Sequence, residues 1–203
     1  MTGAVRRIGA ETSATRALIV TAAEELIRDE GYAAVSTRRV AARAGLKPSL
    51  VHYYFPTTDD LLIELSRRGA DESDRMIEAA LASDEPLHAL WRFFVDTSRT
   101  AMALEFMAMA NHRQALRAHM AEHSEAMRRR QVEILRHVLG DELVASEGCA
   151  PEGLSVVLAG IGRAIVMEEN LGVRAGHEEA IAFVRGWLDR LTADARKDRS
   201  AAE

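Results

Sequence analysis

Apolar residues recur at helical spacing along most of the chain, and this periodicity predicts an all-α fold. In residues 15–29 they fall three and four positions apart, on one face of a helix: Ile19, Ala22, Ala23, Leu26 and Ile27. No stretch shows the sustained alternation of apolar and polar residues that is typical of a half-buried strand. Only four prolines occur, and three of them stand where a helix is expected to begin. We therefore expect about nine helices and no sheet.

The helices are expected to be separated by short turns. Their predicted ranges are 15–29, 36–45, 48–54, 58–82, 86–98, 100–110, 114–139, 153–171 and 177–198. Ser36 is expected to cap the second helix, and Gly45 to end it. Thr57 is expected to cap the fourth helix, with Asp60 in the reciprocal position of a capping box.

Composition bounds the class of protein and its compartment. A chain of 203 residues with 48% hydrophobic and 28% charged residues has room for one large or two small soluble domains. The single cysteine, Cys149, has no intrachain partner for a disulfide. Neither an apolar leader nor a run of roughly 18 apolar residues is present, so we expect a cytoplasmic protein without membrane contact.

Charge is unevenly distributed along the chain. The net charge is −5, yet residues 1–55 carry 8 Lys and Arg against 5 Asp and Glu, whereas the remaining residues carry 18 against 26. A basic N-terminal part on an acidic body is expected when only one end of a protein contacts phosphates.

The segment 36–55 predicts two short helices joined by a turn at Gly45, which is the pattern of a helix-turn-helix motif. Successive helical residues are rotated by about 100°, so the second helix should have an inner and an outer face. An inward-facing Val51 places Pro48, Tyr54 and Phe55 on the inner side. The polar outer face then consists of Ser49, His52 and Tyr53.

Lys47 is unusual at the start of this second helix, because a helix N-terminus repels positive charge and favours Ser, Thr, Asp or Asn as its cap. An external anion such as a DNA phosphate would compensate for the unfavourable placement. Arg38 and Arg39 are expected to add positive charge on the same side. The alternative is an ordinary solvated corner between two helices.

Residues 31–62, "GYAAVSTRRVAARAGLKPSLVHYYFPTTDDLL", resemble the TetR family of transcriptional regulators. The shared features are Gly and an aromatic residue after the first helix, Ser-Thr before the second, Ala-Gly at the turn, and a Tyr-rich end to the third. The resemblance implies a homodimeric regulator, most often a repressor, with an N-terminal three-helix DNA-binding domain over residues 1–57. Residues 58–203 would form an antiparallel helical domain for ligand binding and dimerisation.

The resemblance also implies DNA-contact roles for particular residues. Recognition is expected from Lys47, Pro48, Ser49, His52 and Tyr53. Phosphate positioning is expected from Thr37, Arg38 and Tyr54. Two positions depart from the family pattern, since Lys47 stands where a small polar cap is usual and Thr58 where a lysine is usual.

The helices over 153–171 and 177–198 are expected to form the homodimer interface. The first is apolar nearly all round, and Gly160 and Gly162 leave room for close backbone approach. The second carries an apolar stripe of Ile181, Val184, Trp187, Leu188 and Leu191. The alternative is that both helices complete the core of one chain.

An unidentified small-molecule effector is expected among the helices over 86–139, where Met and aromatic side chains offer adaptable apolar surface beside a few polar groups. The candidate contacts are Trp91, Phe94, Met102, Glu105, Phe106, Met109, His112, Arg113, Met120, His123 and Met127. The alternative is that the Met and Phe side chains form an ordinary core.

A second hypothesis, that the protein is a metal-binding sensor or a zinc hydrolase, rests on "HMAEH", residues 119–123, which fits the H-x-x-E-H pattern of inverted zinc peptidases. Together with His112 and His137, these histidines would lie within about 40° of one another on a continuous helix. They border an apolar stripe, where histidine is common. We expect no metal or cofactor, because a five-residue motif that specifies only two residue types is weak evidence. We assign no catalytic residue, because the sequence also lacks a Gly-rich phosphate loop and a G-x-S-x-G elbow.

Overall fold

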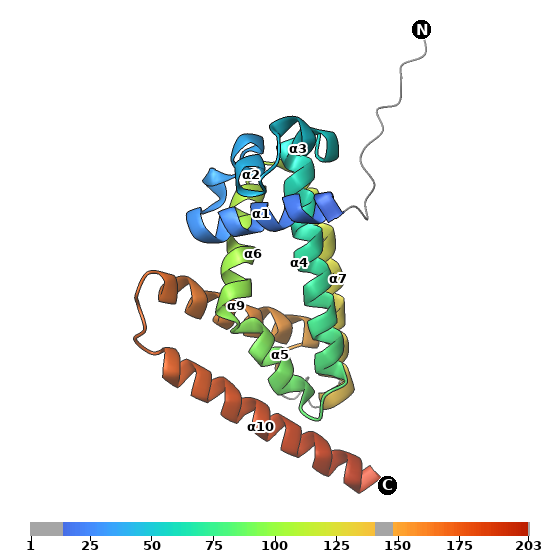
Figure 1. Cartoon of the computed structure of the whole chain (residues 1–203). Coiled ribbons are helices and arrows are strands. Elements are labelled where there is room, and N and C mark those ends of the chain that lie inside the picture. Colours follow the sequence, from blue (N-terminus) through green and yellow to red (C-terminus); the bar gives the residue numbers. More distant parts are fainter. Residues whose placement is uncertain (1–13, 141–147, 203) are drawn as a thin grey trace. The chain divides into compact units, whose positions relative to one another are not determined.

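The computed structural model describes residues 14–140 and 148–202, and over these residues the fold is all-helical, as predicted (Figure 1). The elements are α1 Ala14–Glu30, the 3₁₀ turn η1 Tyr32–Ala34, α2 Thr37–Arg43, α3 Pro48–Tyr54, α4 Thr58–Leu81, α5 Pro86–Phe94, α6 Thr97–Ala110, α7 Gln114–Leu139, α9 Pro151–Asn170 and α10 His177–Ala202. The predicted break between residues 139 and 153 lies partly outside the described residues.

Both predicted helix caps are present. The Ser36 hydroxyl accepts a hydrogen bond from the Arg39 amide at 3.3 Å. At the start of α4, the Asp60 amide donates to Thr57 Oγ1 at 3.1 Å, and the Thr57 amide donates to the Asp60 carboxylate at 2.9 Å. These reciprocal bonds satisfy amides that have no partner within a helix, which fixes where α2 and α4 begin.

The boundary between α5 and α6 differs from the predicted one. The helix expected over 86–98 ends at Phe94, and α6 begins at Thr97. The Asp96 carboxylate accepts a hydrogen bond from the Arg99 amide at 3.1 Å, which is the geometry of an N-terminal cap. The prediction was wrong here because the aspartate was not recognised as a helix start.

The described residues form two compact units, each with its own hydrophobic core. The first contains residues 14–70 and 102–121, and the second contains 71–101 with 122–140 and 148–202. These two units are defined by which residues pack together. The division at residue 57 that the sequence predicts is a different one, because it separates a DNA-binding domain from a ligand-binding and dimerisation domain. That functional division stays a prediction.

The core of the first unit holds the two short helices against α1. Val51 and Phe55 are 1% and 2% exposed, so the predicted burial of these two residues of α3 is confirmed. They join a cluster that includes Ile19, Leu26, Val40, Leu62, Phe106 and Leu116. Because this packing engages one side of α2 and α3, their other side remains free to carry polar residues.

The core of the second unit combines α5, the later part of α7, α9 and α10. Three residues of the α10 stripe, Val184, Leu188 and Leu191, are buried in this core. Gly162 allows α9 to approach α5 closely, because a Cβ at that position would lie 2.8 Å from the carbonyl carbon of Phe94. Much of the apolar surface of both C-terminal helices is therefore used within one chain. Among the described helices, none is long and apolar enough to cross a membrane.

Candidate nucleic-acid interface

The turn between α2 and α3 depends on Gly45, whose φ of +67° lies in the left-handed region that favours glycine. The Leu46 amide donates to the carbonyl of Ala41 at 2.8 Å, which closes the end of α2. Pro48 then begins α3 at a position where its missing N–H costs no hydrogen bond. The sequence thus sets a tight corner that presents α3 beside α2.

The predicted outer face of α3 is exposed, since Ser49 and His52 are exposed and Tyr53 retains 49% of its accessible surface. Lys47 and Pro48 are exposed as well, so Pro48 does not lie on the inner side where the helical rotation placed it. Tyr54 is half-buried, with its ring in edge contact with that of Tyr53 at a centroid distance of 5.2 Å. Five predicted recognition residues therefore lie together on an accessible surface.

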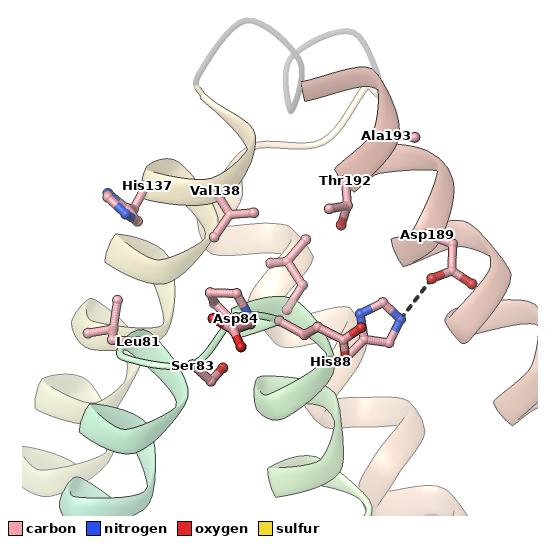
Figure 2. Close-up of a pocket in the computed structure, with 12 residues that line it drawn as sticks. Leu81, Ser83, Asp84, His88, His137, Val138, Asp189, Thr192 and Ala193 are labelled. Carbon is pink, nitrogen blue, oxygen red and sulfur yellow. Dashed lines mark ion pairs between the residues drawn. The ribbon is translucent and has the colours of Figure 1, made fainter. Parts of the chain in front are cut away.

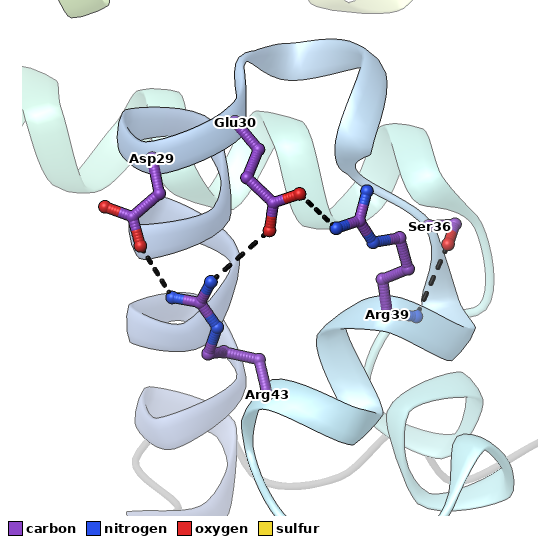
Figure 3. Close-up of polar contacts among 5 residues, drawn as sticks. All are labelled: Asp29, Glu30, Ser36, Arg39 and Arg43. Carbon is purple, nitrogen blue, oxygen red and sulfur yellow. Dashed lines mark hydrogen bonds and ion pairs between the residues drawn. The ribbon is translucent and has the colours of Figure 1, made fainter.

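Two arginines of α2 are committed to ion pairs within the chain (Figure 3). Arg43 donates to the carboxylates of Asp29 at 2.9 Å and Glu30 at 3.4 Å. The hydrogen bond to Asp29 is the main cause of the raised pKa of Arg43. Arg39 donates to Glu30, so it does not supply the free positive charge that the sequence suggested.

Arg38 and Lys47 differ from these two arginines. Both are exposed, and within the described part of the chain neither forms an ion pair. Lys47 stands at the cap of α3 with no side-chain hydrogen bond to the helix. Since an N-terminus already carries partial positive charge, the two cations and the first amides of α3 together favour an anion. Thr37, the first residue of α2, is half-buried nearby in the chain.

A partly buried ion pair connects α1 and α4 beside the helix-turn-helix motif. Arg16 of α1 donates to the Glu64 carboxylate of α4, and its guanidinium lies 4.8 Å from the ring centroid of Phe55. The hydrogen bond from Arg16 is the main cause of the lowered pKa of Glu64. These contacts tie α1 and α4 to the end of α3. Sequence reasoning missed the pair, since 48 residues separate its partners.

The predicted ligand contacts fall into both cores. Trp91, Phe94 and Met127 belong to the core of the second unit. Phe106 and Met109 belong to the core of the first unit, against which Met102 and Met120 also pack. Of the polar candidates, Glu105 and His123 are half-buried, His112 is exposed, and Arg113 forms an ion pair with Asp59.

A pocket in the second unit was missed by the sequence reasoning. It has a volume of about 510 Å³ and lies between the α4–α5 turn, the end of α7 and α10 (Figure 2). His88 Nε2 and Asp189 Oδ1 are 3.0 Å apart at its edge. None of the predicted ligand contacts lines this pocket. No sequence signal linked His88 with Asp189, because they belong to different helices far apart in the chain.

The histidines of the zinc hypothesis are also placed by the structure. His112 lies in the turn before α7, so it does not share a continuous helix with His119, His123 and His137. Over residues 14–140 and 148–202 there is no group of three or more His, Cys, Asp or Glu side chains that could hold a metal ion. The structure offers no support for the hydrolase hypothesis.

Two short packed helices, a glycine turn and an exposed polar second helix define a helix-turn-helix protein. Comparison with known proteins gives the same class. Residues 19–65 match the family described as bacterial regulatory proteins, tetR family. The chain is 31% identical over 151 residues to the HTH-type transcriptional regulator BetI of Rhizobium meliloti, an alignment that covers 71% of this chain and 70% of the relative.

Solved structures share the fold over most of their length. A TetR transcription regulator from Haloarcula marismortui superimposes with a TM-score of 0.69 at 20% sequence identity, and the match covers 87% of this chain and 97% of the regulator's chain. The multidrug binding protein EbrR, complexed with imidazole, superimposes with a TM-score of 0.62 at 26% sequence identity, and the match covers 88% of this chain and 95% of the EbrR chain. The chain belongs to the TetR family, and it is a DNA-binding transcriptional regulator.

Proposed function

We propose that the protein acts as a homodimeric repressor, which binds a palindromic operator and is released by a small-molecule effector. The observation that carries the proposal is the exposed outer face of α3 together with two cations, Arg38 and Lys47, that form no ion pair within the described part of the chain. A role in the cytoplasm and without catalysis accords with this function. We infer that the protein represses transcription, rather than activating it, because it resembles the repressors of this family.

In the proposed complex, α3 lies in the major groove of DNA. Ser49, His52 and Tyr53 then read base edges, since a recognition helix directs its exposed side chains to the floor of the groove. In this complex Lys47 and Arg38 contact DNA phosphates, and Thr37 and Tyr54 help to position the motif on the backbone. Pro48 contacts the DNA through its apolar ring at the start of α3.

The proposed dimer uses the exposed apolar residues that remain on the last two helices. Val156, Val157 and Met167 of α9 and Phe183 of α10 are exposed in the single chain. Large apolar side chains gathered on neighbouring helices are typical of a protein interface. A two-fold assembly would also hold two reading helices at the spacing of successive major grooves, about 34–36 Å.

For the effector, the eleven residues inferred from the sequence remain the candidate contacts, of which Trp91, Phe94, His123 and Met127 belong to the second unit and the others to the first. Trp91 supports this proposal because its indole N–H is buried and lacks a hydrogen-bond acceptor among the described residues. A ligand oxygen would satisfy that donor, whose burial without a partner is unfavourable. EbrR, a similar structure complexed with imidazole, offers a precedent for a small-molecule site in this fold.

Release would follow if the effector binds more tightly to a conformation that does not fit DNA. A shift of α4, which leads from the motif into the rest of the chain, would change the separation of the two reading helices. The coupling free energy then equals the difference in effector affinity between the two conformations.

Replacing Lys47 tests the proposed DNA contact. Lys47→Ala should weaken binding to all duplexes and reduce the slope of log affinity against log salt by about 0.9 for each copy bound, because one phosphate contact is lost. Fluorescence anisotropy over a salt series measures both effects. Arg28→Ala, which removes an arginine already paired with Glu24, is the matched control and should leave the slope nearly unchanged. An unchanged slope in Lys47→Ala would show that Lys47 does not contact a phosphate.

A further inference from the structure

The C-terminal end of α1 holds two arginines of α2 in one network of charges (Figure 3). Glu30, the last residue of α1, accepts hydrogen bonds from Arg39 on one carboxylate oxygen and from Arg43 on the other. Arg43 also donates to Asp29 at 2.9 Å and lies 3.6 Å from a carboxylate oxygen of Glu25. Three carboxylates therefore face two guanidinium groups, and this side of the motif has no excess of positive charge.

The two arginines differ in what Glu30 contributes to each. Arg43 would keep two carboxylate partners, Asp29 and Glu25, if the charge of Glu30 were removed. Arg39 has no ion pair other than the one with Glu30 in the described part of the chain. A carboxylate shared within a network holds an exposed arginine more firmly than an isolated surface pair does. Glu30 therefore controls one cation in particular, that of Arg39.

Arg39 stands at the helix start that the proposed DNA contact uses. It is the third residue of α2 and directly follows Arg38, so their Cα atoms are about 3.8 Å apart. Both side chains are exposed. The guanidinium of a long, exposed arginine suits a phosphate of the DNA backbone. Arg39 would therefore be able to make a second phosphate contact beside that of Arg38 if Glu30 did not hold it.

A purely structural role for Glu30 makes a different prediction. Asp29 and Glu30 lie in the last turn of α1, where the partial negative charge of a helix C-terminus disfavours carboxylates. The arginines of α2 compensate for this repulsion and join the two helices. If that were the whole role, loss of the Glu30 charge would loosen α2 and weaken DNA binding. If Glu30 withholds Arg39, the same loss strengthens DNA binding.

We propose that Glu30 is a positioning residue that holds Arg39 away from DNA phosphates and so limits the affinity of the motif for DNA of any sequence. The inference rests on the proposed use of α2 and α3 as the DNA-contact surface. Phosphate contacts carry no sequence information, so a further contact strengthens binding to non-specific sites, which greatly outnumber an operator in a genome. Glu30 limits how much of the protein those sites retain.

The test measures binding of the whole chain to duplex DNA of random sequence by fluorescence anisotropy over a salt series. Glu30→Gln keeps the size of the side chain and removes its charge. It should tighten binding about fivefold or more at low salt and steepen the slope of log affinity against log salt by about 0.9 for each copy bound, because one arginine gains a phosphate. Adding Arg39→Ala to Glu30→Gln should restore the wild-type slope, because Arg43 keeps its other carboxylate partners.

Glu24→Gln is the matched control. Glu24 also lies on α1, but its partners Arg28 and Arg68 belong to α1 and α4 and not to the two short helices. The substitution adds the same charge to the protein as Glu30→Gln does. It should leave the salt slope nearly unchanged, because it frees no arginine of α2.

Three results would overturn the proposal in a protein whose wild type binds DNA. They are an unchanged or shallower slope in Glu30→Gln, an equal steepening in Glu24→Gln, and a double variant with a slope as steep as that of Glu30→Gln alone. Each of these leaves the proposed function intact. A wild-type protein that binds no duplex at low ionic strength would overturn this proposal and the proposed function together.

Discussion

At the scale of single residues, neighbouring arginines of α2 serve different purposes. Arg39 is paired with Glu30, whereas Arg38 is exposed and unpaired in the described part of the chain. Arg38→Ala should therefore weaken DNA binding and lower its salt dependence by about 0.9 for each copy bound. Arg39→Ala should change the salt slope little and remove a surface ion pair worth about 0.2–1 kcal/mol. Equal effects of the two substitutions on the salt slope would contradict this division.

The pair of Arg16 and Glu64 predicts a pH dependence of stability. The pKa of Glu64 is lowered in the folded protein, so the pair stabilises the fold above the unfolded-state pKa of about 4.3 and loses this effect as pH falls through the lower folded value. Glu64→Gln should reduce the free energy of unfolding by about 2 kcal/mol at pH 7, and the difference should shrink below about pH 4. Urea unfolding of the wild type and of Glu64→Gln at pH 7 and pH 3 measures this difference in the free energy of unfolding.

The control for this prediction is Glu72→Gln, which disrupts the exposed pair with Arg75. It should change stability by less than about 1 kcal/mol at either pH, because exposed pairs are weak. A constant difference between wild type and Glu64→Gln across the pH range would show that Glu64 does not titrate with a lowered pKa.

Residue-level reasoning from the sequence succeeded where the relevant geometry is local. With Val51 taken as buried, helical rotation correctly placed Phe55 inward and Tyr53 outward, although it misplaced Pro48. The spacing of Thr57 and Asp60 predicted their capping box. Pairs between distant segments were missed, among them Arg113 with Asp59, which are 54 residues apart. Such a pair depends on how helices pack, and one sequence carries no direct signal of that.

At the scale of elements, the contact of α9 with α5 requires a glycine. Gly162→Ala would place a Cβ against the Phe94 carbonyl and should destabilise the fold by about 1–3 kcal/mol, because the two helices must move apart. Gly69→Ala is the matched control in α4: its Cβ would meet nothing within 4 Å, and it should stabilise the helix by about 1 kcal/mol. Thermal or urea unfolding measures the change in stability caused by each substitution. Equal changes in stability for Gly162→Ala and Gly69→Ala would mean that α9 and α5 do not meet at Gly162.

The apolar stripes of α9 and α10 illustrate what a helical pattern leaves open. The sequence predicted both stripes but not the surface that each contacts. Val184, Leu188 and Leu191 were assigned to a dimer interface, and the structure shows them buried within one chain. The exposed Phe183 stands outside the predicted stripe. Periodicity specifies an apolar face, whereas its partner follows from the packing of the whole chain.

At the scale of the whole molecule, dimerisation is proposed to depend on the exposed apolar residues of α9 and α10. Phe183→Asp should shift the protein towards the monomer by at least about tenfold in dissociation constant, because a charge would be buried in an apolar interface. Analytical ultracentrifugation measures the shift. Leu18→Asp, which alters another exposed apolar residue, on α1, should leave the dissociation constant unchanged. A Phe183→Asp protein that remains dimeric would exclude this face.

The location of the effector is a property of the whole molecule, and here the sequence was least informative. Met and aromatic residues were grouped by their proximity in the chain, yet the structure places them in two cores. Apolar composition does not distinguish a filled core from a chamber that opens for a ligand. The pocket beside His88 and Asp189 was missed because its walls come from segments about a hundred residues apart.

Selection of bound fragments from random duplex DNA tests most directly whether α3 reads DNA. The purified protein should enrich a short palindrome, since two copies related by two-fold symmetry read identical half-sites. A His52→Ala, Tyr53→Ala double variant should lose the base preference while still binding DNA weakly through its phosphate contacts. Failure to enrich any sequence at low ionic strength, or enrichment of the same palindrome by the double variant, would contradict a recognition role for this helix.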